Sequence, residues 1–193
     1  MKNPNQQSLL RFQPWCSRPE RAFSLHEALV TLAVVSTVTT IAVPSLQQFT
    51  SHQRMTGAVN SLITALHLAR SEAIKRRDDA VLCPSTDGRA CVNGGSDWHD
   101  GYMLYIDHNN NREIDGAEPV IQIFGSTHGL RLINTSNHDH VRYKSNGMAS
   151  FTNATFIVCD GHGRSAPKAV VIANSGRVRA ATRMPGGGSI ACP

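Results

Sequence analysis

The chain has 193 residues, of which 40% are hydrophobic and 17% are charged, and this composition suits one globular domain with one additional apolar helix. It has no P-loop, no G-x-G-x-x-G turn and no repeat of 20 to 50 residues, which argues against nucleotide-binding and solenoid proteins. The formal net charge of +5 is unevenly distributed, because no acidic residue follows Asp160. A locally cationic C-terminal segment predicts an anionic partner. Its basic residues are Arg164, Lys168, Arg177, Arg179 and Arg183.

The first predicted element is an apolar helix. Residues 28–43 carry no charge, and with residues 23–25 the run reaches about 20 residues, the length that crosses a bilayer core. Glu27 lies near its front, where a carboxylate is costly and usually marks function. A cleaved secretory signal is the alternative, because basic residues precede the run. That alternative expects a small-x-small cleavage site after the run, but the sequence continues into an amphipathic pattern.

Residues 22–27, Ala-Phe-Ser-Leu-His-Glu, resemble the cleavage and methylation motif of type IV prepilins. The resemblance implies that residues 1–22 are a leader, which prepilin peptidase removes after Ala22, although Gly is usual at that position. Phe23 would then carry the methylated N-terminus, and Glu27 would pair with this amine in its own or a neighbouring pilin subunit. The protein would span the inner membrane once, with residues 23–43 in lipid and a periplasmic domain, and would then enter an extracellular pilus.

The helical period continues beyond Pro44, because apolar residues recur at steps of three and four and no other proline occurs before Pro84. We predict one helix from about Phe23 to Arg77, roughly 80 Å long at 1.5 Å per residue. Its amphipathic half, residues 44–77, would pack on the globular domain. The basic residues at its C-terminal end would interact favourably with the negative end of the helix dipole.

Residues 78–193 are predicted to form a β-rich globular pilin domain. Short runs of β-branched and aromatic residues alternate there with Gly, Asn, Asp and Pro clusters. We therefore expect an α+β, type IV pilin-like fold, in which the long N-terminal helix packs against an antiparallel β-sheet domain. The strand-like runs are 80–85, 101–107, 119–124, 130–133, 141–144, 154–159, 168–174 and 177–181.

The globular domain holds an even number of cysteines, which suits an oxidising compartment. Cys83, Cys91, Cys159 and Cys192 allow three pairings, and sequence alone does not choose among them. We favour Cys83 with Cys91, which closes a short loop, and Cys159 with Cys192, which ties down a Gly-rich tail. A zinc site is the alternative, but the chain has no C-x-x-C pair.

Residues 97–124 resemble the Trp-x-x-Gly-aromatic strand and Asp/Asn-rich hairpin of the FimT/GspH group of minor pilins and pseudopilins. Within them, residues 107–118 place oxygen-bearing side chains at calcium-loop positions 1, 3, 5, 7, 9 and 12. Against calcium, Arg112 replaces the usual Gly and the flanks are predicted strands. Ordinary turn chemistry is therefore the favoured interpretation. A metal site at His138 and His140 is likewise less favoured than a polar loop.

The C-terminal stretch 174–183 predicts a nucleic-acid interface. A turn at Asn174–Gly176 would place Arg177 and Arg179 on one face of the next strand, about 7 Å apart, where their guanidiniums could bind successive phosphates. This Gly-Arg-x-Arg stretch resembles the DNA-binding motif of FimT-type minor pilins of competent bacteria. The resemblance implies that Gly176, Arg177 and Arg179 contact DNA. On electrostatic grounds we add Arg183, Lys168 and Arg164.

The sequence shows no catalytic motif and implies no cofactor, so we expect a protein that is not an enzyme. The prediction is a minor type IV pilin that binds extracellular DNA for natural transformation. Two alternatives remain. One is a GspH-like pseudopilin of a type II secretion system with a structural assembly role, and the other assigns the arginines to protection of an edge strand against aggregation.

Overall fold

The structure is a computed structural model that describes residues 23–94, 97–116, 118–136, 138–150 and 154–192. The predicted leader, residues 1–22, lies outside the described residues. The chain divides into two units, residues 1–42 and 43–193, which we treat separately.

Helix α1 runs from Leu25 to Arg76, close to the predicted limits of 23 and 77. Ser24 caps its start, because the Ser24 hydroxyl oxygen accepts a hydrogen bond from the Glu27 amide at 3.2 Å. The helix ends in a Schellman-type turn. Arg77 adopts a φ of 59°, and the Asp78 amide donates to the Ala73 carbonyl at 3.2 Å.

In the first unit, the described part of α1 is exposed along its whole length. Its Ser and Thr hydroxyls donate to carbonyls three or four residues earlier, as Thr31 does to Ala28 at 2.9 Å, so these polar groups are satisfied within the helix. By length and composition the helix could cross a membrane.

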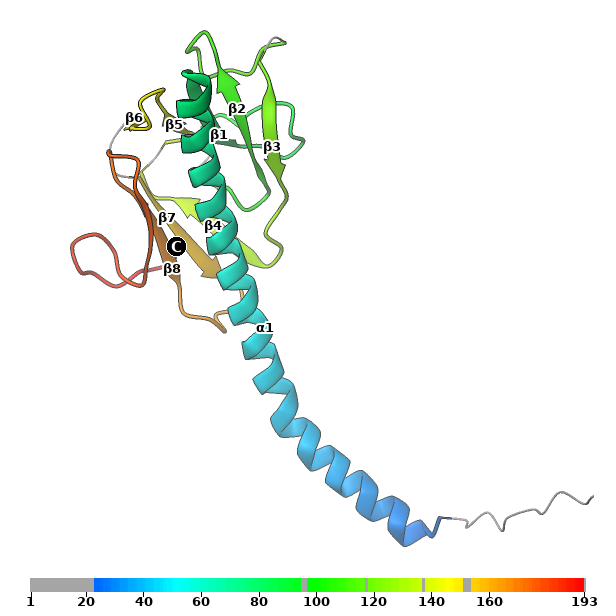
Figure 1. Cartoon of the computed structure of the whole chain (residues 1–193). Helices are drawn as coiled ribbons and strands as arrows, with labels where there is room; N and C mark the ends of the chain where they lie inside the picture. The colour runs from blue at the N-terminus through cyan, green and yellow to red at the C-terminus, as the bar shows by residue number, and fades with distance from the viewer. Residues whose placement is uncertain (1–22, 95–96, 117, 137, 151–153, 193) are drawn as a thin grey trace, which may run out of the picture. The chain divides into compact units, whose positions relative to one another are not determined.

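In the second unit, α1 carries a buried stripe that packs on the β-domain (Figure 1). Met55, Leu62, Ala65 and Leu66 are fully buried in the main core. Their spacing of three and four residues places them on one face of the helix. The stripe is Ser51, Met55, Ala58, Val59, Leu62, Ala65, Leu66, Ala69 and Ala73.

The described residues form nine strands in two antiparallel sheets (Figure 1). The first sheet has the order β3-β2-β1-β5-β6 and the second has the order β4-β7-β8-β9. The bounds are β1 Asp79–Pro84, β2 Tyr102–Asp107, β3 Val120–Phe124, β4 Leu130–Asn134, β5 Val141–Tyr143, β6 Ala149–Ser150, β7 Ala154–Asp160, β8 Lys168–Ile172 and β9 Val178–Ala181.

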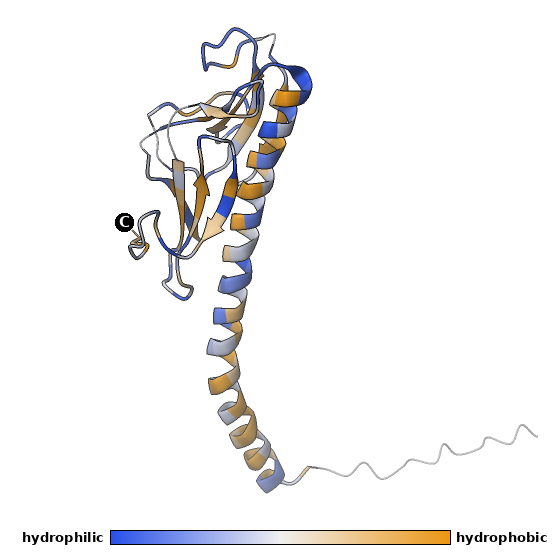
Figure 2. Ribbon diagram, turned by 60° about the vertical axis from the view of Figure 1, so that its left-hand side comes forward, coloured by the Kyte–Doolittle hydropathy of each residue, from blue (hydrophilic) through white to orange (hydrophobic). Residues whose placement is uncertain are grey.

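Successive residues of a strand face alternately toward α1 and toward the outer side. The strands are coloured mainly as hydrophobic in Figure 2. In β7, Phe156 and Val158 join the core against α1, whereas Ile157 and Cys159 join a smaller outer cluster. The outer clusters are apolar because loops cover them, and both favoured disulfides are present there. They join Cys83 to Cys91 and Cys159 to Cys192.

The α+β pilin-like fold and all eight predicted strand regions are confirmed. Two features differ from the expectation of one sheet. The strands divide between two sheets, because β1 pairs with β5 far along the chain while β4 pairs with β7. The short β6 was not predicted, since Ala149–Ser150 carries no β-branched or aromatic residue.

Candidate nucleic-acid interface

The predicted DNA-binding stretch forms the edge of the second sheet. Strand β9 pairs only with β8 in the sheet order, with Arg179 opposite Val171, and the Arg177 carbonyl accepts the Ala173 amide at 2.9 Å. Arg177 directly precedes β9 and Arg179 lies within it, and both residues are exposed. Their projection from one face of the strand stays a prediction. The structure thus displays two guanidiniums in a row along an accessible edge.

Gly176 has a structural role that the sequence did not reveal. Its φ is 79°, and a Cβ atom added to it would lie 2.2 Å from the Gly147 carbonyl oxygen. The β8–β9 turn therefore packs directly on the turn between β5 and β6, and the Ala149 amide donates to the Asn174 carbonyl at 3.0 Å. Only glycine fits this crossing, which fixes where Arg177 emerges. Contact between Gly176 and DNA stays a prediction.

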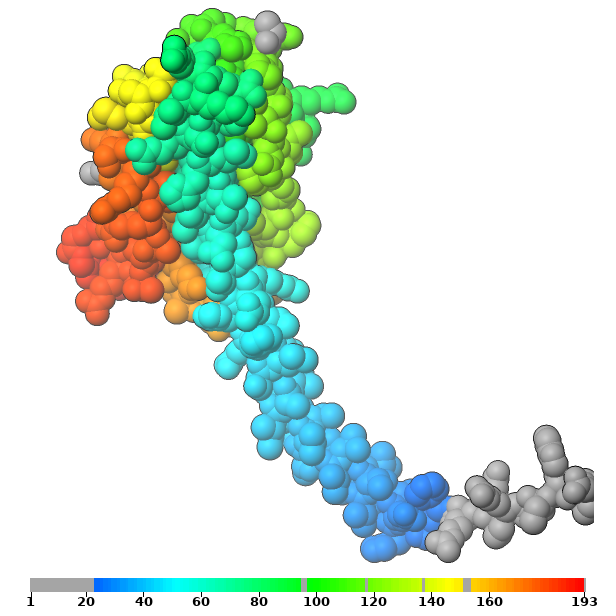
Figure 3. Space-filling model, viewed as in Figure 1, coloured from blue at the N-terminus to red at the C-terminus, as the bar shows by residue number. Residues whose placement is uncertain are grey.

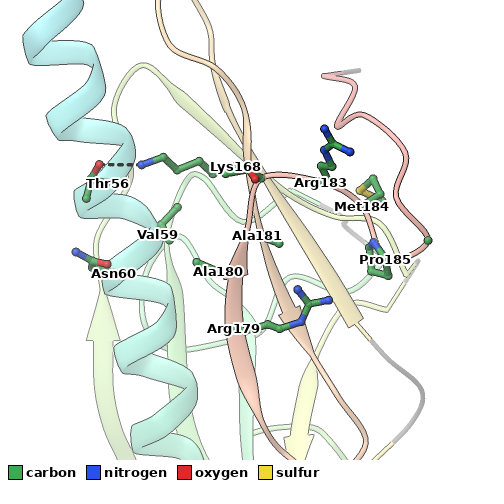
Figure 4. Close-up of a pocket in the computed structure, with 12 residues that line it drawn as sticks. Thr56, Val59, Asn60, Lys168, Arg179, Ala180, Ala181, Arg183, Met184 and Pro185 are labelled. Carbon is green, nitrogen blue, oxygen red and sulfur yellow. Dashed lines mark hydrogen bonds between the residues drawn. The ribbon is translucent and has the colours of Figure 1, made fainter.

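A groove of about 620 Å³ follows β9 (Figure 4). Lys168, Arg179 and Arg183 line it, and the described lining residues include no Asp or Glu. Lys168 turns toward α1, where its ammonium group donates to the Thr56 hydroxyl at 3.0 Å. Arg179 leaves β9 on the other side of the strand in the same view. The three cations share a groove, but their head groups do not converge on one point.

Arg164 lies apart from this groove, in the exposed loop between β7 and β8. Asp160 shapes that loop, since its carboxylate accepts the Arg164 amide at 2.8 Å and the Ser51 hydroxyl at 2.6 Å. Burial raises the pKa of Asp160, but hydrogen bonds from Ser51 and from the amides of His162, Arg164 and Ser165 outweigh it and lower the pKa below its ordinary value. The ionised Asp160 thus ties the loop to α1.

The six predicted DNA-binding residues therefore occupy an extended surface rather than a single pocket. Arg177 directly precedes β9, Arg179 lies within the strand and Arg183 lies beyond its end. In the part of the chain that the structure describes, none of the five cations forms an ion pair with a carboxylate. One further cation, Arg70 of α1, lies close to the Gly176 turn, and no sequence pattern pointed to it.

The predicted assembly residues lie at the start of α1. Glu27 occupies the first helical turn, where a carboxylate also stabilises the positive end of the helix dipole. Phe23 is 79% exposed. Ala22 lies outside the described residues, so cleavage there and pairing of Glu27 with an amine stay predictions.

The hairpin loop that resembles a calcium loop closes on itself. The buried Asp107 carboxylate accepts the amides of Asn111 and Arg112, both at 3.1 Å, and Glu118 accepts the His108 amide at 2.8 Å. Arg112 takes a φ of 65°, the conformation that glycine usually supplies at this position. Among the described residues, no three His, Cys, Asp or Glu side chains form a cluster able to hold a metal ion. His140 instead contacts the adjacent Asp139 carboxylate at 2.6 Å.

Comparison with known proteins identifies the family. A family model described as Type II transport protein GspH matches residues 58–176. The chain is 32% identical over 108 residues to the pilin-like protein PilA1 of Thermus thermophilus, and this match covers 56% of the chain and 59% of that protein.

Solved structures show the same fold. The type IV minor pilin FimU of Pseudomonas aeruginosa superposes with a TM-score of 0.54 at 21% identity, covering 68% of this chain and 90% of FimU. A second crystal form of FimU gives a TM-score of 0.52 at 20% identity, with 65% and 91% covered. Because the GspH model matches more than half of the sequence, this chain belongs to the GspH/FimT family of type IV minor pilins and pseudopilins.

Proposed function

We propose that this chain is a minor type IV pilin that binds extracellular DNA through the β9 edge and serves natural transformation. The observation that carries the proposal is the acid-free edge. Arg177, Arg179 and Arg183 are exposed along it, and no carboxylate pairs with them among the described residues. Several unpaired guanidiniums along one edge match the repeated charges of a phosphate backbone.

The geometry favours sequence-independent binding. Two guanidiniums two residues apart on a strand are about 7 Å apart, close to the spacing of successive phosphates. Phosphate contacts position a protein on DNA without reading bases. The described residues that line the groove include no aromatic side chain, so none of them offers a stacking surface for unpaired bases. We therefore expect binding to double-stranded DNA of any sequence that weakens steeply with salt.

The rest of the proposal concerns where the protein works. Prepilin peptidase would cleave after Ala22 and leave α1 as a single-pass anchor in the inner membrane. The domain would then face the periplasm, where its two disulfides are stable. The mature subunit would join other pilin subunits in an extracellular pilus through α1 and Glu27. In this proposal the chain binds and assembles and catalyses no reaction.

The second candidate is a structural pseudopilin of a type II secretion system, and one observation favours it. Arg177, Arg179 and Arg183 follow an edge strand, where cationic side chains commonly block pairing with another chain. In that case the arginines would prevent aggregation, and the domain would contact neighbouring pseudopilins.

The test is DNA binding by the full chain in a zwitterionic detergent, followed by the anisotropy of a short fluorescein-labelled duplex. The wild type is compared with Arg177→Gln/Arg179→Gln and with the matched control Arg54→Gln/Arg89→Gln, whose arginines lie away from β9. Binding that weakens with salt and is lost only in the first variant supports the proposal. Equal or absent binding in wild type and the first variant would favour the pseudopilin.

A further inference from the structure

Arg70 is a cation of α1 that lies over the contact between two turns. A Cβ atom added to Gly147 would lie 3.2 Å from Arg70 Nε, and one added to Gly176 would lie 3.3 Å from Arg70 Cζ. The Arg70 guanidinium group therefore lies close to both the β5–β6 turn and the β8–β9 turn. A side chain at either glycine would require the Arg70 side chain to shift.

Arg70 has no counter-charge in the described part of the chain. It forms no ion pair there, although it is partly buried. Its neighbour Tyr143 is fully buried, and among the described residues its hydroxyl group has no hydrogen-bond partner. Burial raises the pKa of Tyr143 to about 12, although the Arg70 charge lowers it. A partly desolvated cation among neutral groups is costly unless an anion pairs with it.

Two further cations lie in or next to these two turns. Arg177 directly follows Gly176, and Lys144 begins the β5–β6 turn, where the Gly147 amide donates to the Lys144 carbonyl at 2.7 Å. Both side chains are exposed. The space-filling view shows the β5–β6 segment, the β8–β9 segment and α1 side by side on one face (Figure 3). Three elements that are distant in sequence thus bring three cations to one end of the second sheet.

We infer that Arg70 is a phosphate-binding residue of the DNA interface, which extends from the β9 edge across the two turns to α1. The inference rests on the proposed function and adds a site to it. The planar guanidinium of Arg70 binds one phosphate bidentately, beside the phosphate that Arg177 binds. The duplex would then cross the turn end of the sheet rather than lie along β9 alone.

The test measures the affinity of the full chain in zwitterionic detergent for the labelled duplex between about 50 and 200 mM salt. Arg70→Gln is expected to weaken binding about tenfold at low salt, since a hydrogen bond to a charged group is lost. The slope of log affinity against log salt should become shallower by about one. The control Arg54→Gln removes an exposed arginine of the same helix, about 24 Å away along the axis and about 160° around it, and should change neither quantity.

Three outcomes separate the two claims. Unchanged binding by Arg70→Gln, with loss of binding in Arg177→Gln/Arg179→Gln, overturns the inference and leaves the proposed function standing. Absence of binding by the wild type overturns both. Arg70→Lys covers the case in which Arg70→Gln fails to fold. Arg70→Lys should keep the salt slope but lose about threefold in affinity, because the ammonium group is a point charge and lacks the planar geometry of the guanidinium. Unchanged affinity would again overturn the inference.

Discussion

Gly176→Ala tests whether the glycine of the Gly-Arg-x-Arg stretch is required by packing. The φ of 79° costs a non-glycine residue about 1 to 2 kcal/mol. The new Cβ would also lie 2.2 Å from the Gly147 carbonyl oxygen, so the two turns must separate, at about 1 to 3 kcal/mol. The sum predicts a loss of about 3 kcal/mol in the free energy of unfolding.

Gly163→Ala is the matched control. Gly163 has a similar φ of 67°, but a Cβ there meets no atom within 4 Å, so only the conformational cost of about 1 to 2 kcal/mol remains. Urea unfolding of the chain in detergent, followed by the fluorescence of the buried Trp98, measures both. For a slope of about 2 kcal/mol/M, the Gly176→Ala midpoint should fall by about 1.5 M. Equal midpoints for the two variants would refute the packing argument.

Three other changes have defined expectations. Cys159→Ala opens the disulfide to Cys192, which closes 33 residues, and should cost about 3.7 kcal/mol in the same urea experiment; a loss below about 1 kcal/mol would contradict the loop-entropy account. The lowered pKa of Asp160 means that its ionised form stabilises the fold above pH about 4 and that this stabilisation is lost as pH falls further. Asp160→Asn should therefore lose less stability than wild type between pH about 5 and 3, and an equal loss would argue against this role. Glu27→Ala should reduce incorporation into pili, measured by immunoblot of sheared filaments, while the urea midpoint of the domain stays unchanged; normal incorporation would remove Glu27 from assembly.

Local sequence patterns were sufficient to predict most elements. The strand-like runs are bounded by Gly, Asn and Pro, which break β structure at specific positions, so their limits could be placed within one or two residues. The helix was predictable from its period and from the absence of proline between Pro44 and Pro84. The sequence left three disulfide pairings open, and the favoured one, based on loop length and the need to anchor the tail, is the pairing present.

Long-range pairing was not predictable in the same way. Nothing in residues 79–84 or 141–143 shows that β1 and β5 pair, because each strand alone would fit either sheet. The contact between Gly147 and Gly176 joins turns about 30 residues apart, and Arg70 reaches them from a helix still further away. An isolated arginine in an amphipathic helix looks like any solvated residue, so only the fold reveals its neighbours.

The most direct test of the DNA interface is a photo-crosslink that locates bound duplex on the surface. A benzoylphenylalanine placed at Thr182, exposed between Arg179 and Arg183, should crosslink to a labelled duplex at low salt and lose the crosslink as salt rises. The same group at Ile123, 55% exposed on the β3 edge of the other sheet, should give little product. Equal crosslinking at both edges, or more at β3, would contradict the assignment of DNA to β9.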